Sequence, residues 1–315
     1  MMESTTAETT PLDTSPGPST ILADNDLFTP DFFFDSATGV FDRLLDRLGH
    51  PPYTTDTADT YVVGRVSADD FQALKDERDE RGRKFRFFFL REANIVIVTI
   101  PTGAHEQMHV TLSYDLDRAM TRMGVENEWE WTAAEAYTTS NGSEVEGDAT
   151  GGPTSPGGLN EWPTLVIESG YSQSIQSLRN KAMWWFHQSG HRMKVVLLIK
   201  MNIRNSSIHI EKWTERAAAR LPGARTTRLS ARTGQAGGWQ AECRQIVDIL
   251  WTGPAPIRQT PNQARADPAL YHVAGGPLTI SFADIFLRPP VGGEHDFVVT
   301  VLELQRLAAR AWKKA

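Results

Sequence analysis

The sequence predicts an α/β fold in which a mixed central sheet is flanked by helices. One observation is a set of apolar, β-branched segments, at 85–90, 93–101, 164–169, 194–202 and 207–213, that are typical of strands. A second is that segments with apolar residues at helical spacing lie between them. Strands that alternate with helices along a chain form a sheet covered by packed helices.

The first elements are a hairpin and a long helix. Residues 85–90 and 93–101 are bounded by polar residues and by Pro101, which favours a strand pair. In the following segment the apolar residues repeat every fourth position, which marks one face of a helix: Met108, Leu112, Leu116 and Met120. Trp129 and Trp131 then alternate with polar residues, as in a further strand.

The second half repeats this alternation. A strand at 164–169 precedes a helix, whose apolar stripe consists of Ile175, Leu178, Ala182 and Trp185. The apolar segment 194–202 is typical of a central strand, and 207–213 alternates like its hairpin partner. The C-terminal segment VVTVLELQRLAARAW has the pattern of a basic amphipathic helix.

Three segments lack such patterns. Residues 1–26 are acidic and rich in Ser, Thr and Pro, with too little apolar content to fold, so we expect a disordered tail. Residues 139–160 and 219–240 are rich in Gly, Ser, Pro or Arg and are predicted to be long loops. The remainder, residues 27–315, is predicted to form a single α/β domain.

Composition excludes several classes of protein. A single cysteine, Cys243, rules out an internal disulfide framework. No apolar run approaches the roughly 20 residues that span a bilayer, so no membrane association is expected. The N-terminus lacks the features of a signal peptide, and we therefore expect a cytoplasmic or nuclear protein.

The net charge is unfavourable for a dedicated nucleic-acid binder. It is −7, from 39 acidic and 32 basic residues, whereas phosphate contacts need clustered Lys and Arg. Basic residues do gather at 81–91 and at 179–204. A local basic face therefore stays compatible with the sequence.

Two charged residues lie in strands that are otherwise apolar. Glu168 lies in TLVIES and Lys200 in KVVLLIKMN. An ionised group in such a strand is costly unless it is paired, hydrogen-bonded or bound to a cation. Two hypotheses stay open: a structural ion pair between Glu168 and Lys200 on neighbouring strands, or a catalytic role.

The segments PTLVIESGYSQS, LRNKAMWW and VVLLIKMN, in this order, resemble the fungal relatives of a bacterial restriction-endonuclease family. That family belongs to the PD-(D/E)XK nuclease superfamily. The upstream segment IVIVTIPTGAHEQMHVTLSYDLDRAM is similar to the strand, Pro-containing turn, histidine and leucine-rich helix of the same family. The resemblance covers residues 85–213 and implies a restriction-endonuclease-like core.

This resemblance implies a Mg²⁺-dependent nuclease that acts on DNA. In such a site two carboxylates hold the cation, and an amine steadies developing charge. Glu168 corresponds to the second carboxylate. The first would be Glu146 or Asp148, and the amine would be Lys200 or Lys181.

The sequence departs from the family pattern in two places. The lysine expected two residues after the second acid is replaced by Gly170, and no Pro-Asp pair precedes the Glu168 strand. These departures favour the alternative hypothesis, a catalytically degenerate interaction module that keeps the nuclease scaffold.

His105 and Glu106 open the helix after Pro101. In the family this helix start lies near the mouth of the active site, so either residue is a candidate to support metal or phosphate. The structural interpretation is that Thr102 caps the helix and Glu106 complements its dipole.

Overall fold

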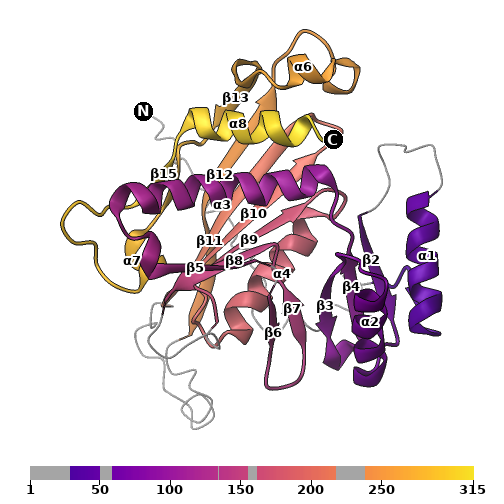
Figure 1. The fold of residues 1–315 in the computed structure, drawn as a ribbon. Helices are drawn as coiled ribbons and strands as arrows, with labels where there is room; N and C mark the ends of the chain where they lie inside the picture. Colours follow the sequence, from indigo (N-terminus) through magenta and orange to yellow (C-terminus); the bar gives the residue numbers. More distant parts are fainter. Residues whose placement is uncertain (1–28, 50–58, 134, 155–161, 218–237) are drawn as a thin grey trace, which may run out of the picture.

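The structure confirms the predicted mixed α/β class. It is a computed structural model that describes residues 29–49, 59–133, 135–154, 162–217 and 238–315. Within these ranges the chain forms sheets of seven, six and two strands, with helices packed on the two larger sheets (Figure 1). The predicted tail at 1–26 lies outside the described residues.

The seven-stranded sheet contains the predicted strands of the second half. Its order is β13 (Tyr271–Ala274), β12 (Trp239–Trp251), β11 (Ser207–Ala217), β10 (Val195–Asn202), β9 (Leu165–Gly170), β8 (Ala149–Pro153) and β5 (Trp129–Ala133). Strands β9 and β10 are parallel, and the other neighbours in this sheet are antiparallel. A parallel pair needs a crossover connection, which α4 (Ile175–Gln188) supplies.

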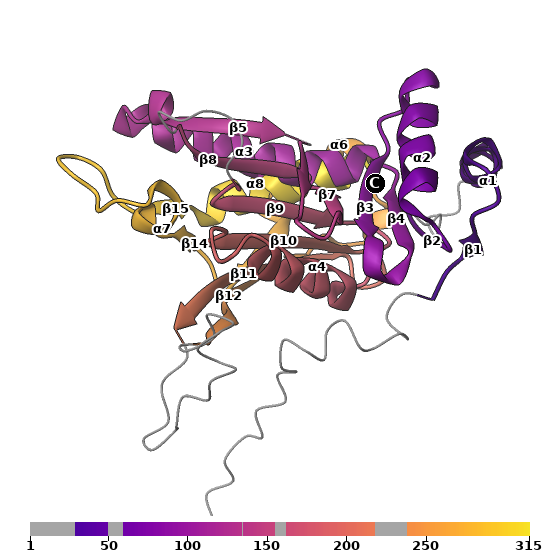
Figure 2. The ribbon, with the colours of Figure 1, turned by 90° about the horizontal axis from the view of Figure 1, so that it is seen from below.

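Helices cover both faces of this sheet (Figures 1 and 2). On one face lie α3 (Gly103–Met123) and α8 (Val301–Trp312), which form one apolar core with Leu165 and Ile167 of β9. The predicted stripe from Met108 to Met120 belongs to this core, and the predicted C-terminal helix is confirmed. On the other face α4 packs against alternate residues of the same strands.

The six-stranded sheet is built mainly from the N-terminal residues. Its order is β1 (Phe32–Phe33), β2 (Thr60–Gly64), β4 (Ile95–Thr99), β3 (Arg86–Leu90), β7 (Glu144–Glu146) and β6 (Ala136–Thr138). The predicted hairpin at 85–101 is the antiparallel pair β3–β4. On one face α1 (Ala37–Gly49) and α2 (Ala68–Glu80) enclose a core rich in phenylalanine.

Helix α4 lies between the two larger sheets. Its residues Leu178 and Trp185 share one buried cluster with Val196 of β10 and with Phe88 and Val145 of the six-stranded sheet. A polar side chain of α4 that points into this cluster, such as that of Lys181, is therefore enclosed by protein on both sides.

The prediction of a surface loop at 139–160 is wrong for the two parts of it that form strands. It contains β7 and β8, and the chain passes from the six-stranded to the seven-stranded sheet between them. Glycine serves close packing here: a Cβ at Gly151 would lie 2.7 Å from the indole of Trp129. Residues 155–161 lie outside the described residues.

The predicted loop at 219–240 is only partly described. Residues 218–237 lie outside the described residues, while Trp239 and Gln240 already belong to β12, which corrects the predicted boundary.

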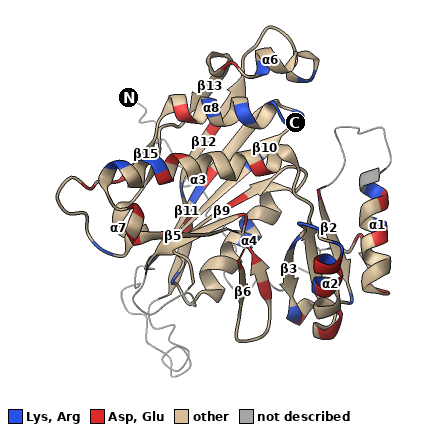
Figure 3. Ribbon diagram, viewed as in Figure 1, with Lys and Arg blue, Asp and Glu red and all other residues tan. Residues whose placement is uncertain are grey.

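The remaining elements are short. They are β14 (Leu278–Ile280), β15 (Phe297–Val299), α6 (Asn262–Arg265), α7 (Phe282–Phe286) and the 3₁₀ turns Arg91–Ala93, Glu126–Glu128, Ile257–Gln259 and Pro268–Leu270. Within the described ranges no helix has the length and apolarity needed to cross a membrane. Acidic and basic residues both occur along α1, α2 and α3 (Figure 3).

Candidate active site

Glu168 of β9 forms a buried ion pair with α4. Its side chain is 1% exposed, and Lys181 Nζ donates to Oε2 at 2.7 Å. The indole Nε1 of Trp185, one helical turn further along α4, donates to Oε1 at 2.7 Å. Burial and the nearby charge of Asp148 raise the pKa of Glu168, although Lys181 opposes this shift. Glu168 thus faces α4, whereas its neighbour Ile167 belongs to the core on the α3 side of the sheet.

The hypothesis of a Glu168–Lys200 ion pair is wrong. The parallel register places Lys200 beside Gly170 and Glu168 beside Leu198. The ammonium of Lys200 donates to the carbonyl oxygen of Tyr171 instead. Burial lowers the pKa of Lys200. Of the two predicted amines, Lys181 is the one that contacts Glu168.

Asp148 lies beside Glu168, at the point where the chain enters β8. The next residue, Ala149, pairs with Ile167 in the antiparallel β8–β9 ladder. Asp148 Oδ2 accepts a hydrogen bond from the backbone N–H of Ser169 at 2.6 Å. Its side chain is 3% exposed, and Arg86 Nη1 donates to Oδ1 at 2.6 Å.

Glu146 is held in a different environment, although it is only two residues away. Its Oε1 pairs with Arg78 at 2.7 Å, and its Oε2 accepts from the backbone N–H of Phe87 at 2.9 Å. Only its backbone carbonyl reaches the site, where it accepts from Lys181 Nζ at 3.2 Å. The geometry therefore favours Asp148 over Glu146 as the partner of Glu168.

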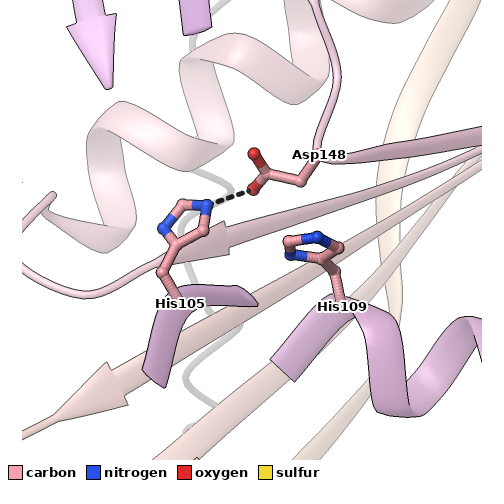
Figure 4. Close-up of side chains that lie close together, drawn as sticks. All are labelled: His105, His109 and Asp148. Carbon is pink, nitrogen blue, oxygen red and sulfur yellow. Dashed lines mark ion pairs between the residues drawn. The ribbon is translucent and has the colours of Figure 1, made fainter. Parts of the chain in front are cut away.

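His105 connects Asp148 to a second aspartate. Its Nε2 lies 3.1 Å from Asp148 Oδ2, and its Nδ1 lies 3.5 Å from Asp59 Oδ2 (Figure 4 shows the contact with Asp148). Burial alone would lower the pKa of His105, but the two carboxylates raise it to about 9. The same imidazole and Arg86 hold the pKa of Asp148 well below its ordinary value, against the effect of burial.

Glu106 also contributes to the site. The predicted cap is present, because Thr102 Oγ1 accepts from the backbone N–H of His105 at 3.2 Å. Glu106 lies in the first turn and pairs with Arg86 at 2.9 Å. Arg86 thus bridges Glu106 and Asp148, so the helix start lies at the candidate site.

Sequence reasoning missed three residues of this group, Asp59, Arg86 and His109. His105 and His109 lie four residues apart on α3, which is a spacing that could have been noticed. Asp59 directly precedes β2 and Arg86 begins β3, so both are distant in sequence from Asp148 and Glu168. No local sequence pattern marks them as members of the site.

The comparisons with known proteins find similarity among solved structures but not among protein families or curated proteins. No protein-family model matches the chain, and no curated protein does. Among solved structures, the chain is similar to a "putative nuclease belonging to DUF820" from Anabaena variabilis, with a TM-score of 0.33 and 12% identity. The match covers 50% of this chain and 89% of that one. At this TM-score the similarity supports no inference about activity, and it does not point to fungal relatives in particular.

Proposed function

We propose that the chain is a metal-dependent phosphodiester hydrolase that acts on DNA, with Asp148, Glu168 and Lys181 as its active-site residues. The observation that supports this most is the pairing of two buried carboxylates at adjacent strands with an ammonium from the crossover helix. These are the groups that hydrolysis of a phosphodiester needs: oxygen ligands for a cation and a positive charge for the transition state.

The residues fit a hard divalent cation such as Mg²⁺. Such ions prefer carboxylate oxygens and bind through one or two protein carboxylates. The charge of Asp148 adds to burial in raising the pKa of Glu168, so the two carboxylates repel each other. A cation between two such groups relieves that repulsion. Asp148 and Glu168 would hold the ion, which would polarise a phosphate oxygen and activate water.

The neighbouring cationic residues have roles that follow from their contacts. Lys181 is anchored by Glu168 and by the carbonyl of Glu146, so its ammonium is held at the site. An ammonium fixed in this position stabilises negative charge on a pentavalent phosphate. Arg86, 12% exposed, presents a planar guanidinium that is suited to bind a second phosphate oxygen.

The alternative, a degenerate interaction module, is favoured by one specific observation. Each oxygen of the two carboxylates already accepts or faces a protein donor: Arg86, the Ser169 N–H and His105 for Asp148, and Lys181 and Trp185 for Glu168. Carboxylates satisfied in this way are stable without a metal. The scaffold could therefore persist after activity is lost.

Plasmid cleavage tests the proposed function. We expect the purified chain to nick supercoiled DNA with Mg²⁺ or Mn²⁺ and to lose this activity in EDTA. Glu168→Gln and Lys181→Met should each reduce the rate about 100-fold or more, whereas the matched variant Lys200→Met should stay near the wild-type rate. Circular dichroism would establish that each variant is folded. Folded wild-type protein that cleaves neither double- nor single-stranded DNA with either metal would contradict the proposal and favour the module.

A further inference from the structure

Two histidines of α3 and Asp148 converge on one buried point beside the carboxylate pair. His105 and His109 lie one helical turn apart, and Asp148 faces them from the start of β8 (Figure 4). One side-chain nitrogen or oxygen of each residue lies within 4.8 Å of the others. All three side chains are buried, with 2% or 3% exposure.

The hydrogen bonds leave part of this cluster unexplained. Nδ1 of His109 is buried and has no hydrogen-bond partner among the described residues. A buried polar atom without a partner is costly and needs an explanation. A histidine of α3 with a purely structural role would not need a free nitrogen at this position.

Each imidazole has a carboxylate on its other side. His105 Nδ1 lies 3.5 Å from Asp59 Oδ2, opposite the nitrogen that faces Asp148. His109 Nε2 lies 3.5 Å from Glu106 Oε2, so its Nδ1 is the nitrogen left over. Histidines that bind metals have this arrangement, in which an outer carboxylate orients the ring and increases its basicity.

From this geometry we infer that His105, His109 and Asp148 form a binding site for a divalent transition-metal ion such as Zn²⁺. A set of two imidazole nitrogens and one carboxylate oxygen suits transition-metal ions better than it suits Mg²⁺. The ion would take the place of the proton between His105 Nε2 and Asp148 Oδ2, and that proton would be released to solvent. This inference does not depend on hydrolytic activity, because it concerns the binding of a metal ion. Two of the three ligands, His105 and His109, lie outside the proposed active site.

Arg86 is the neighbour that must adjust. It contacts Oδ1 of Asp148, whereas His105 lies at Oδ2, so the guanidinium and the ion use different oxygens. Its Nη1 also lies 3.3 Å from His105 Nε2. Because an ion bound to His105 Nε2 would lie beside this guanidinium, metal binding requires Arg86 to move toward Glu106. Arg86 already pairs with Glu106 at 2.9 Å.

A Zn²⁺ titration tests this site without DNA. The full chain is first freed of metal with EDTA and then titrated in the presence of a chromophoric chelator that competes for Zn²⁺. We expect one tight site per chain that His109→Ala weakens by more than roughly tenfold, and that Asp59→Asn weakens about 10–100-fold through the orientation of His105. The control His272→Ala changes an exposed histidine on β13 and should leave the affinity unchanged. Glu168→Gln should also retain Zn²⁺ binding, even if it abolishes DNA cleavage.

A second measurement uses only the wild-type chain, in case His109→Ala does not fold. Electron paramagnetic resonance of the chain loaded with one equivalent of Cu²⁺ reports the number of coordinated nitrogens. Two imidazole nitrogens would support the site. Absence of tight Zn²⁺ binding, equal affinities for His109→Ala and His272→Ala, or a Cu²⁺ spectrum with fewer than two nitrogens would overturn it.

Discussion

Replacing Lys181 with methionine leaves Glu168 as a buried carboxylate without its cationic partner. The pair has a separation of 2.7 Å, and its side chains are 10% and 1% exposed. Removing one member of such a pair destabilises a protein by about 3–5 kcal/mol, whereas replacing both members by neutral groups is close to neutral. We therefore expect Lys181→Met to lose that amount and Lys181→Met/Glu168→Gln to recover most of it, since glutamine still offers Trp185 an acceptor.

The loss of stability caused by Lys181→Met should increase as the pH rises from acid to neutral. The pKa of Glu168 is already raised in the folded protein, mainly by burial, and loss of Lys181 raises it further. The folded state then binds a proton more tightly than the unfolded chain, so stability falls as the pH rises from the unfolded pKa to the folded one. The deficit of Lys181→Met is thus smallest in acid and largest at neutral pH.

Urea unfolding of the wild type, the two single variants and the double variant measures this cycle. We predict a coupling energy of about 2 kcal/mol or more between the two positions at neutral pH. A useful control is Arg43→Met, because Arg43 pairs with Asp35 at 2.6 Å on the surface and should change stability little. Additive effects at positions 168 and 181, or a Lys181→Met variant as stable as the wild type, would refute the reasoning.

Three further predictions concern the rest of the fold. Side-chain donors outweigh burial and lower the pKa of Glu211 from its ordinary value of 4.5 to about 2. The stabilising contribution of Glu211 is therefore complete above pH 4.5 and is lost as the pH falls toward 2. Urea titrations in acid should therefore show a shallower loss for Glu211→Gln than for the wild type, and parallel curves would contradict this. Gly275→Ala should lower the thermal unfolding temperature more than Gly292→Ala does. Both glycines have positive φ, but only a Cβ at Gly275 would lie 2.2 Å from the carbonyl oxygen of Ile246. Equal losses for the two variants would show that this contact is relieved. Leu116→Ala should cost about 2–5 kcal/mol in urea unfolding, as expected for a fully enclosed core leucine, and a loss below about 1 kcal/mol would argue against the α3 core.

Local patterns were sufficient for a helix with one buried face and for strands that are apolar throughout. The stripe from Met108 to Met120 and the apolar segments around Glu168 and Lys200 are regular enough to define α3, β9 and β10. The segment 139–160 was mistaken for a loop because its glycines are typical of turns. In the structure Gly151 instead allows β8 to approach Trp129, which is a contact that composition does not reveal.

The site was partly predictable for the same reason. A charged residue in an apolar strand stands out, so Glu168 was found directly. The choice between Lys200 and Lys181 depends on the register of two parallel strands and on the position of α4, neither of which is local. At Gly170, where the family pattern has a lysine, a Cβ would lie 2.8 Å from the side chain of Leu178 on α4, so a larger residue would have to displace that leucine.

The choice between Glu146 and Asp148 was also beyond the sequence. Both acids precede β8 and both are buried. They differ because the chain changes sheets between them, which leaves Glu146 with Arg78 and brings Asp148 to Glu168. Long-range partners such as Asp59 could not be assigned from spacing at all.

The most direct test of the proposed active site compares Asp148→Asn with Glu146→Gln in one DNA-cleavage assay with Mn²⁺. Both variants neutralise a buried acid within the same turn of chain, so they are matched in position and chemistry. The proposed site predicts that Asp148→Asn lowers the cleavage rate about 100-fold or more, while Glu146→Gln loses stability but cleaves at a rate close to wild type per folded molecule. Cleavage that survives Asp148→Asn, or that is lost only with Glu146→Gln, would contradict it.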